Sequence, residues 1–215
     1  MNNIKIRNKK LAEKIINNLQ KRNFKAYFCE NKQETIQKIE ELISKTETIS
    51  WGGSITLEET GIKNFLEENN YKTINRDKGK TKEEKEQIVR QGLISDVFLM
   101  SANAITEDGI IINIDGTGNR ISALCFGPKR VIIIAGMNKI VKTVEDGLSR
   151  ARNYAAPINA QRINNLIGIN TPCTENGSCV NCKSETSICS QILTTRLSNP
   201  KGRITVILVN EELGY

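Results

Sequence analysis

Val131-Ile132-Ile133-Ile134-Ala135 is the stretch that decides the fold, because it is apolar without interruption. A strand with one face in water alternates apolar and polar residues, whereas a strand covered on both faces has no such need. The stretch therefore predicts a central strand of a mostly parallel sheet. Single helices separate the strand patterns around it, so the sequence predicts an α/β fold with helices on both faces of the sheet.

The other elements follow from periodicity and turn residues, and the whole chain, residues 1–215, is expected to form one domain. Strands are expected at Phe24–Cys29, Thr48–Trp51, Tyr71–Ile74, Asp96–Met100, Ile110–Ile114 (after an Asp108-Gly109 turn), Val131–Ala135 and Ile204–Val209. Helices are expected around Leu11–Leu19 and Ile36–Ile43, from about Leu57 and Thr81, over Arg120–Phe126, Val141–Tyr154 and Ala160–Leu166, and through Ile192 and Leu193.

Composition narrows the classes of partner. The net charge of +7 comes from interleaved charges rather than from blocks of one sign, and aromatic residues make up 5% of the chain. That leaves little material for stacking on bases, so nucleic acid is not an expected partner. No apolar run is long enough for a bilayer span, and the first ten residues lack the apolar core of an export signal. A cytoplasmic protein without a membrane partner is expected.

Positive charge is concentrated in one part of the chain. Between Asp115 and Asn165 there are eight basic residues and three acidic ones. Such an excess indicates a small anionic ligand, for example a carboxylate or a phosphate, although a solvated basic surface would have the same composition.

Three polar motifs follow predicted strands, at the edge of a parallel sheet where ligands bind. In the first, two glycines permit close backbone approach to an anion and two hydroxyls precede a helix, although a helix cap also accounts for Thr56. The second is rich in Asn and Gly and includes Arg120, and the third places an amide and a cation after Gly136. The predicted ligand-binding residues are Gly52, Gly53, Ser54, Thr56, Asn103, Thr106, Asp108, Asn119, Arg120, Asn138 and Lys139.

Four cysteines form the most concentrated chemical motif: Cys173, Cys179, Cys182 and Cys189 lie within seventeen residues that are rich in turn formers. The chain contains no histidine, so a metal site here would have four thiolates. Four thiolates suit zinc or an iron–sulfur cluster, with sulfurs about 2.3 Å from the metal. Two disulfides or unrelated free thiols are the alternatives. The segment 173–189 is expected to be a metal-binding excursion anchored at both ends.

The two remaining cysteines, Cys29 and Cys125, stand in apolar surroundings and are expected to be buried and unligated. The missing histidine also excludes Ser–His and Cys–His nucleophile pairs. Proton transfer would need a carboxylate, a lysine or a thiol, and Glu58, Glu59 and Asp108 are the carboxylate candidates. A capping or solvated role fits each of them too, so no catalytic residue is assigned and enzymatic activity stays open.

Several of these motifs recur together in a known family. They are Trp51–Ser54, Asn103–Gly109, Gly118–Arg120, Gly127–Lys129, Gly136–Val141 and Ala156–Ala160. In order and spacing they resemble the LUD (lactate utilisation) domain family. Within it the chain is similar to the C protein of bacterial lactate-utilisation operons, in a short form with a four-cysteine C-terminal segment. The resemblance implies a Rossmann-like domain, similar to the ribose-5-phosphate isomerase and CoA-transferase superfamily, with its site at the strand ends.

The resemblance also implies a function in lactate or organic-acid oxidation. The chain would bind a small anion and carry an iron–sulfur cluster, with [4Fe–4S] as the candidate type, that exchanges electrons with a redox partner protein. One alternative is a non-catalytic binding or regulatory subunit with a structural zinc. Another is an enzyme acting on a phosphorylated or CoA-linked small molecule. Assembly into a homo-oligomer is left open.

Overall fold

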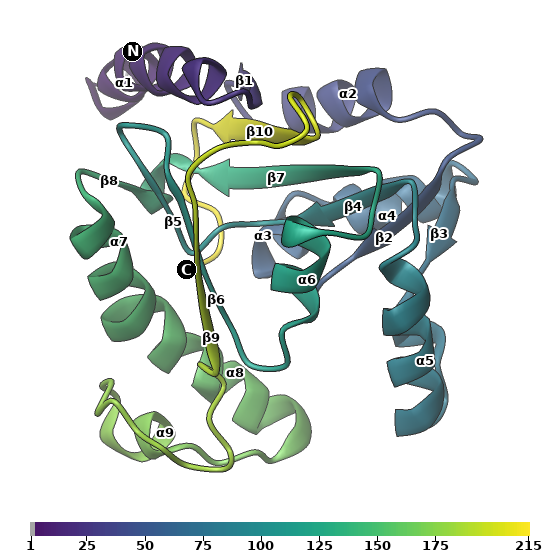
Figure 1. Ribbon diagram of the computed structural model, residues 1–215, viewed down its shortest axis with the longest axis vertical. Helices are drawn as coiled ribbons and strands as arrows, with labels where there is room; N and C mark the ends of the chain where they lie inside the picture. The colour runs from purple at the N-terminus through teal and green to yellow at the C-terminus, as the bar shows by residue number, and fades with distance from the viewer. Residues whose placement is uncertain (1–2) are drawn as a thin grey trace.

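Six parallel strands form the main sheet of the computed structural model, which describes residues 3–215 (Figure 1). In sheet order the strands are β1 (Lys25–Cys29), β10 (Ile204–Val209), β7 (Arg130–Gly136), β4 (Val97–Met100), β2 (Thr48–Trp51) and β3 (Lys72–Ile74). Every neighbouring pair is parallel. The mostly parallel sheet is therefore confirmed.

Strand β7 lies inside this sheet, between β10 and β4. Its residues alternate between two separate cores: Ile133 belongs to one, whereas Ile132 and Ile134 belong to the other. All three are fully buried. Full burial of one such side chain stabilises the fold by about 1.5–3 kcal/mol, which explains why this strand is apolar without interruption.

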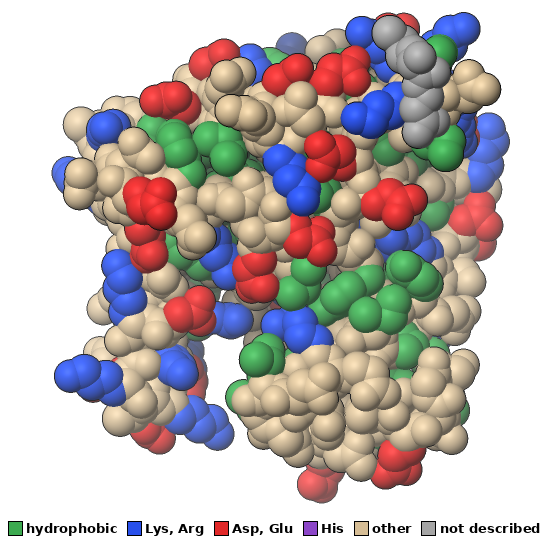
Figure 2. All heavy atoms as spheres, turned by 180° about the vertical axis from the view of Figure 1, so that it is seen from behind, with side chains coloured by type: hydrophobic (Ala, Val, Ile, Leu, Met, Phe, Trp, Pro, Cys, Tyr) green, Lys and Arg blue, Asp and Glu red, His purple; other side chains and the backbone are tan. Residues whose placement is uncertain are grey.

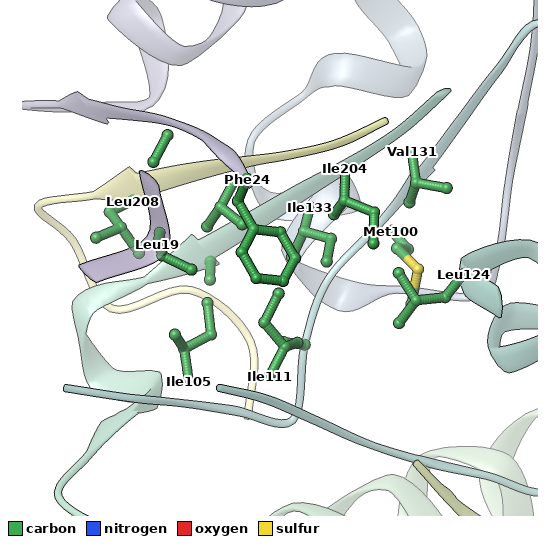
Figure 3. Close-up of a cluster of buried hydrophobic side chains, with 14 of the residues drawn as sticks. Leu19, Phe24, Met100, Ile105, Ile111, Leu124, Val131, Ile133, Ile204 and Leu208 are labelled. Carbon is green, nitrogen blue, oxygen red and sulfur yellow. The ribbon is translucent and has the colours of Figure 1, made fainter. Parts of the chain in front are cut away.

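Helices cover both faces of the sheet. On one face, helix α1 (Asn3–Lys21) inserts Leu19 among the labelled side chains of Figure 3, beside Phe24, Ile133 and Leu208. On the other face lie α2 (Lys32–Leu42), α3 (Ile55–Glu59) and α4 (Ile62–Glu68). The predicted α/β fold with helices on both faces of the sheet is thus confirmed.

A second, smaller sheet packs beside the first core. Its order is β8 (Ile140–Val141), β5 (Ala104–Thr106), β6 (Ile111–Asp115) and β9 (Gln191–Thr195). Strands β5 and β6 are antiparallel and joined through Asp108-Gly109, as the turn signal predicts. The strand predicted at Ile110–Ile114 thus exists, but it belongs to this mixed sheet and not to the parallel one.

Two helix predictions need correction. The segment through Ile192 and Leu193 is strand β9, paired antiparallel with β6; it contains three β-branched residues among five, which favour a strand beside a partner. The helix predicted over Val141–Tyr154 begins at Val144, because Val141 already belongs to β8. It then continues through a π-helical turn (Ala151–Ala155) into the next helix, without the predicted break.

The remaining elements extend from the sheet toward one side of the molecule (Figure 1). They are the 3-10 turn η1 (Arg76–Lys78), α5 (Lys82–Gly92), α6 (Asn119–Cys125), α7 (Val144–Arg150), α8 (Ala156–Ile167) and α9 (Pro172–Asn176). Helix α5 projects at one side of the view and α8 with α9 at the other. Within residues 3–215, no helix combines the length and the apolar character that crossing a membrane requires.

Candidate functional site

A cleft of about 1030 Å³ lies between α5, α8 and the ends of the strands. Figure 2 shows it from behind as a notch between two lobes of the surface. Its lining includes seven of the residues predicted to bind a ligand: Gly53, Ser54, Thr56, Asn103, Asn119, Arg120 and Lys139. These residues come from turns after different strands, and the sheet brings them to one place.

The cleft has an excess of positive charge. Its cationic lining residues are Arg76, Lys82, Lys85, Arg90, Arg120, Lys139 and Arg162, and its acidic ones are Asp77, Glu86 and Asp115. Asp115 is paired with Arg120, at 3.1 Å between Oδ1 and Nη2. Concave surfaces with one dominant sign concentrate the field, so this cleft attracts anions.

The Gly52-Gly53 turn makes room for two arginines. A Cβ atom on Gly52 would lie 2.4 Å from Cγ of Arg120, and one on Gly53 would lie 2.8 Å from Nη2 of Arg76. The glycines therefore admit cationic side chains, whereas the sequence suggested direct backbone approach to an anion. Ser54, which follows them, accepts a hydrogen bond from the Leu57 N–H and caps α3.

Arg120 is fixed by the strand that precedes its helix. Its Nη2 donates to the Ile114 carbonyl at 3.0 Å and to Asp115 Oδ1 at 3.1 Å. Asp115 also accepts from the backbone N–H of Arg120 at 2.9 Å, so one carboxylate orients both the side chain and the first turn of α6. The side chain keeps a quarter of its surface exposed toward the cleft.

Lys139 lies at the inner end of the cleft and is 3% exposed. Its Nζ donates to Thr56 Oγ1 and to Ser101 Oγ, each at 3.0 Å. Burial lowers the pKa of Lys139 to about 7; the positive charge of Arg150 adds to this, while Glu59 opposes it. The sequence predicted a fixed cation here, whereas the surroundings favour an amine that is partly neutral near pH 7.

Three predicted site residues have other contacts. Thr106 Oγ1 accepts from the Ile110 N–H within the β5–β6 hairpin, and Asp108 pairs with Arg22 at 2.5 Å. Neither borders the described cleft, because the hairpin is antiparallel and its turn packs against α1. Asn138 bonds the Leu213 N–H and the Gly214 carbonyl, and it borders a separate pocket of about 490 Å³.

The carboxylate candidates for proton transfer are also engaged. Glu58 forms an ion pair with Lys63 at 3.1 Å, and Glu59 accepts from the Gly214 N–H at 2.7 Å. Neither is among the described residues that line the main cleft. Lys139, by contrast, borders the main cleft.

The four clustered thiols lie near one another. Burial is the main cause that raises the pKa of Cys189 to about 11, and the charges of Cys173, Cys179 and Cys182 raise it further. The four thiols thus influence one another electrostatically, and the donor set suits a soft metal. However, no three or more Cys, Asp or Glu side chains of residues 3–215 are arranged to hold a metal ion. The donor chemistry fits a metal or cluster, while the coordination geometry is not formed.

The two cysteines outside the cluster, Cys29 and Cys125, differ in burial. All six thiols of the chain are free, and Cys29 is buried as predicted. The prediction that Cys125 is buried is wrong, because Cys125 is exposed at the last position of α6. The preceding Leu124 occupies the core in its place.

Both walls of the cleft contain residues that belong to none of the three strand-end motifs. On α5, the lining residues Lys82, Lys85, Glu86, Val89 and Arg90 recur at helical spacing. On α8, Ile163, Leu166 and Ile167 form an apolar stripe of the same kind. The periodicity of the sequence reveals each stripe. Only the fold shows that the two stripes face the same cleft.

Comparison with known proteins gives the family. No curated protein matches the sequence. Among solved structures, the crystal structure of a DUF162 family protein from Deinococcus radiodurans is similar, with a TM-score of 0.55, 10% identity, and coverage of 95% of this chain and 98% of that chain. At that identity the likeness concerns the fold alone. A family model described as the LUD domain matches residues 12–209, most of the chain, and the protein therefore belongs to the LUD domain family.

Proposed function

We propose that the cleft binds a small organic anion and that the protein takes part in lactate or organic-acid oxidation. The observation that carries this proposal is that six further cationic side chains line the cleft whose inner end is formed by Thr56, Ser101 and Lys139. Membership of the LUD domain family supports the link to organic acids.

Arg120 is the residue expected to hold the acid group. Its Nη2 is committed to Ile114 and Asp115, whereas residues 3–215 give Nε and Nη1 no hydrogen-bond partner. A carboxylate or phosphate oxygen would accept from these nitrogens, in a bond strengthened by charge. Thr56 and Lys139 line the same cleft and are more deeply buried than Arg120, so they would contact the remainder of the ligand.

Binding of lactate, pyruvate and inorganic phosphate, measured by calorimetric titration, tests the proposal. Arg120→Ala should weaken binding by roughly 10- to 100-fold, because a hydrogen bond to a charged group is worth about 1.5–3 kcal/mol. Arg130→Ala is the matched control, since Arg130 is also partly buried and paired with a carboxylate, Glu47, away from the cleft. If the wild type binds none of the three anions, or if both variants lose the same affinity, the proposal is wrong.

We further propose that Cys173, Cys179, Cys182 and Cys189 hold an iron–sulfur cluster, with zinc as the alternative. The support is the gathering of four thiols in a chain without histidine. When bound, a cluster supplies one-electron transfer to a partner protein. Ile188 and Cys189 also line the cleft, so the cysteine segment forms part of the cleft wall.

Metal content of protein purified without oxygen distinguishes the two metals. Bound iron and sulfide, with a brown colour, support the cluster. Bound zinc in a colourless protein supports the alternative, a non-catalytic binding or regulatory subunit with a structural zinc. Cys182→Ser should lose the metal and the exposed Cys125→Ser should keep it, whereas metal-free wild type would contradict both assignments.

A larger ligand is the alternative that the cleft itself favours. Its volume of about 1030 Å³ is that of a site for a drug-sized molecule and exceeds the needs of a three-carbon acid. Its wall also includes the apolar residues Ile163, Leu166, Ile167 and Ile169. A phosphorylated or CoA-linked molecule could place phosphates along α5 and apolar atoms along α8.

A further inference from the structure

We propose that Lys139 is a nucleophilic amine that forms an imine with the carbonyl carbon of an aldehyde or ketone acid held in the cleft. This inference rests on the proposed anion binding and adds to it a substrate class and a reacting atom. Three observations carry it: the hydrogen-bond pattern around Nζ, the charges that surround it, and its place at the inner end of the cleft.

The hydrogen bonds account for two N–H groups of Lys139. Thr56 Oγ1 donates its single hydrogen to the Leu213 carbonyl at 3.3 Å, and Ser101 Oγ donates to the Ala102 carbonyl at 3.4 Å. Since each hydroxyl has one hydrogen, each must accept from Nζ in its 3.0 Å contact with Lys139. The two hydroxyls thus use two hydrogens of the amine.

This pattern suits a neutral amine. A neutral Nζ has two hydrogens and one lone pair, so both hydrogens are bonded and the lone pair stays unused. A charged Nζ has a third hydrogen, and residues 3–215 offer it no further acceptor. Lys139 borders the cleft, so this third hydrogen would face the cleft, whereas the two hydroxyls accept from both hydrogens of the neutral amine.

The surrounding charges act in the same direction. Arg150 at the end of α7 and Arg120 on α6 are cationic, and Glu59 on α3 is the opposing carboxylate. Glu59 bonds the Gly214 N–H rather than Lys139. Together with burial, this set lowers the pKa of Lys139 to about 7, so that about half of the amine is neutral at pH 7. A lysine that is desolvated beside other cations is a recognised form of activated nucleophile.

The covalent step is balanced without any further reagent. The lone pair of Nζ attacks the carbonyl carbon, and the π electrons of the carbonyl move to its oxygen, which takes one amine proton. The resulting carbinolamine expels this oxygen as water with the second amine proton, and a C=N bond forms. Amine and carbonyl thus give imine and water, with nothing oxidised or reduced. By accepting hydrogen bonds from Nζ, Thr56 and Ser101 orient the two amine hydrogens before the attack.

Borohydride trapping with pyruvate tests the step. Treatment of the full chain with pyruvate and sodium borohydride should give a reduced adduct on the peptide that contains Lys139. Lys142 is the internal control: it is three residues away, mostly exposed, and paired with Glu107 at 3.1 Å. Lys142 should stay unmodified, and Lys139→Arg should remove the adduct. Because the site is mapped on the wild type, the result does not depend on folding of the variant.

A neutral probe separates this inference from anion binding. Acetylacetone condenses with neutral amines and carries no acid group. The pH dependence of its reaction should have a midpoint near 7 at Lys139.

The outcomes are distinguishable. If calorimetry shows pyruvate binding but neither probe modifies Lys139, the imine proposal is wrong while anion binding stands. A second outcome is that acetylacetone modifies Lys139 with a pH midpoint near 7 while pyruvate neither binds nor reacts. In that case the proposed anion binding and the keto-acid substrate are both wrong, and only the reactive amine stands. Adducts spread evenly over exposed lysines would overturn the assignment of Lys139.

Discussion

At the scale of single residues, Lys139 combines a reactive position with a cost in stability. Its folded pKa of about 7 lies below the unfolded value of about 10.4, so between these values the unfolded chain binds more protons than the folded one. The unfolding free energy should therefore rise with pH across this window, by up to about 1.4 kcal/mol per pH unit. Below pH 7 both states are protonated and the cost is constant.

Lys139→Met removes this contribution while keeping an apolar chain of similar length. Its unfolding free energy should be higher than that of the wild type at pH 7 and should lack the wild-type rise from pH 7 to 9. Urea unfolding at pH 7, 8 and 9 measures both effects, with the exposed Lys142→Met as the control that should follow the wild type. If the unfolding free energies of Lys139→Met and the wild type change with pH in parallel, the pKa of Lys139 is not lowered in the folded state.

The state of Lys139 shows where inference from the sequence ends at this scale. Its position after an apolar strand predicted a residue of the strand-end site, and Lys139 does border the cleft. Its burial depends on Thr56 and Gly214, which are 83 and 75 residues away in the chain. A local pattern contains no signal for such distant packing, so the lowered pKa could not be predicted.

At the scale of elements, the predictable strands are those with a strong apolar pattern. β7 and β10 were predicted because burial on both faces leaves a continuous apolar run. β9 was not, because QILTT has helix-compatible apolar residues, and only pairing with β6 makes it a strand. Thr106 and Asp108 were misplaced for a similar reason: the antiparallel partnership of β5 with β6 turns them away from the strand-end cleft.

The cysteine segment is anchored at both ends but irregular between them. Gln161 of α8 donates to the Thr174 carbonyl at 2.7 Å in α9, and β9 pairs with β6 over five residues. Between Asn176 and Gln191 the backbone forms neither helix nor strand. A bound metal would supply the constraint that this stretch lacks.

Cys182→Ser should therefore loosen this segment while the parallel sheet stays folded. Limited proteolysis of anaerobically prepared protein should cut the variant faster than the wild type between Leu166 and Leu193, with the far-ultraviolet circular dichroism nearly unchanged. Cys125→Ser, which changes an exposed thiol at the end of α6, should be cut like the wild type. Equal resistance of all three proteins would show that a metal is not what orders the segment.

At the scale of the whole molecule, the cleft is formed by two walls that differ in chemistry. The α5 wall contributes Lys82, Lys85 and Arg90, whereas the α8 wall combines one cation, Arg162, with an apolar stripe that includes Ile163. The notch in Figure 2 separates these walls at the surface, with Lys and Arg side chains on the α5 lobe. A ligand that reaches only the inner end would contact the strand-end turns, whereas a larger one would touch both walls.

Hydrogen–deuterium exchange can therefore measure the size of the ligand. We expect lactate or pyruvate to slow exchange at residues 53–56 and 101–103, which line the inner cleft, and to leave α5 unchanged. Helix α2, on the opposite face from α1, is the internal control and should not respond. If coenzyme A instead protects both α5 and α8 while lactate protects neither turn, the small-acid assignment is wrong. In that case a phosphorylated or CoA-linked ligand that spans the two walls accounts for the full 1030 Å³ of the cleft.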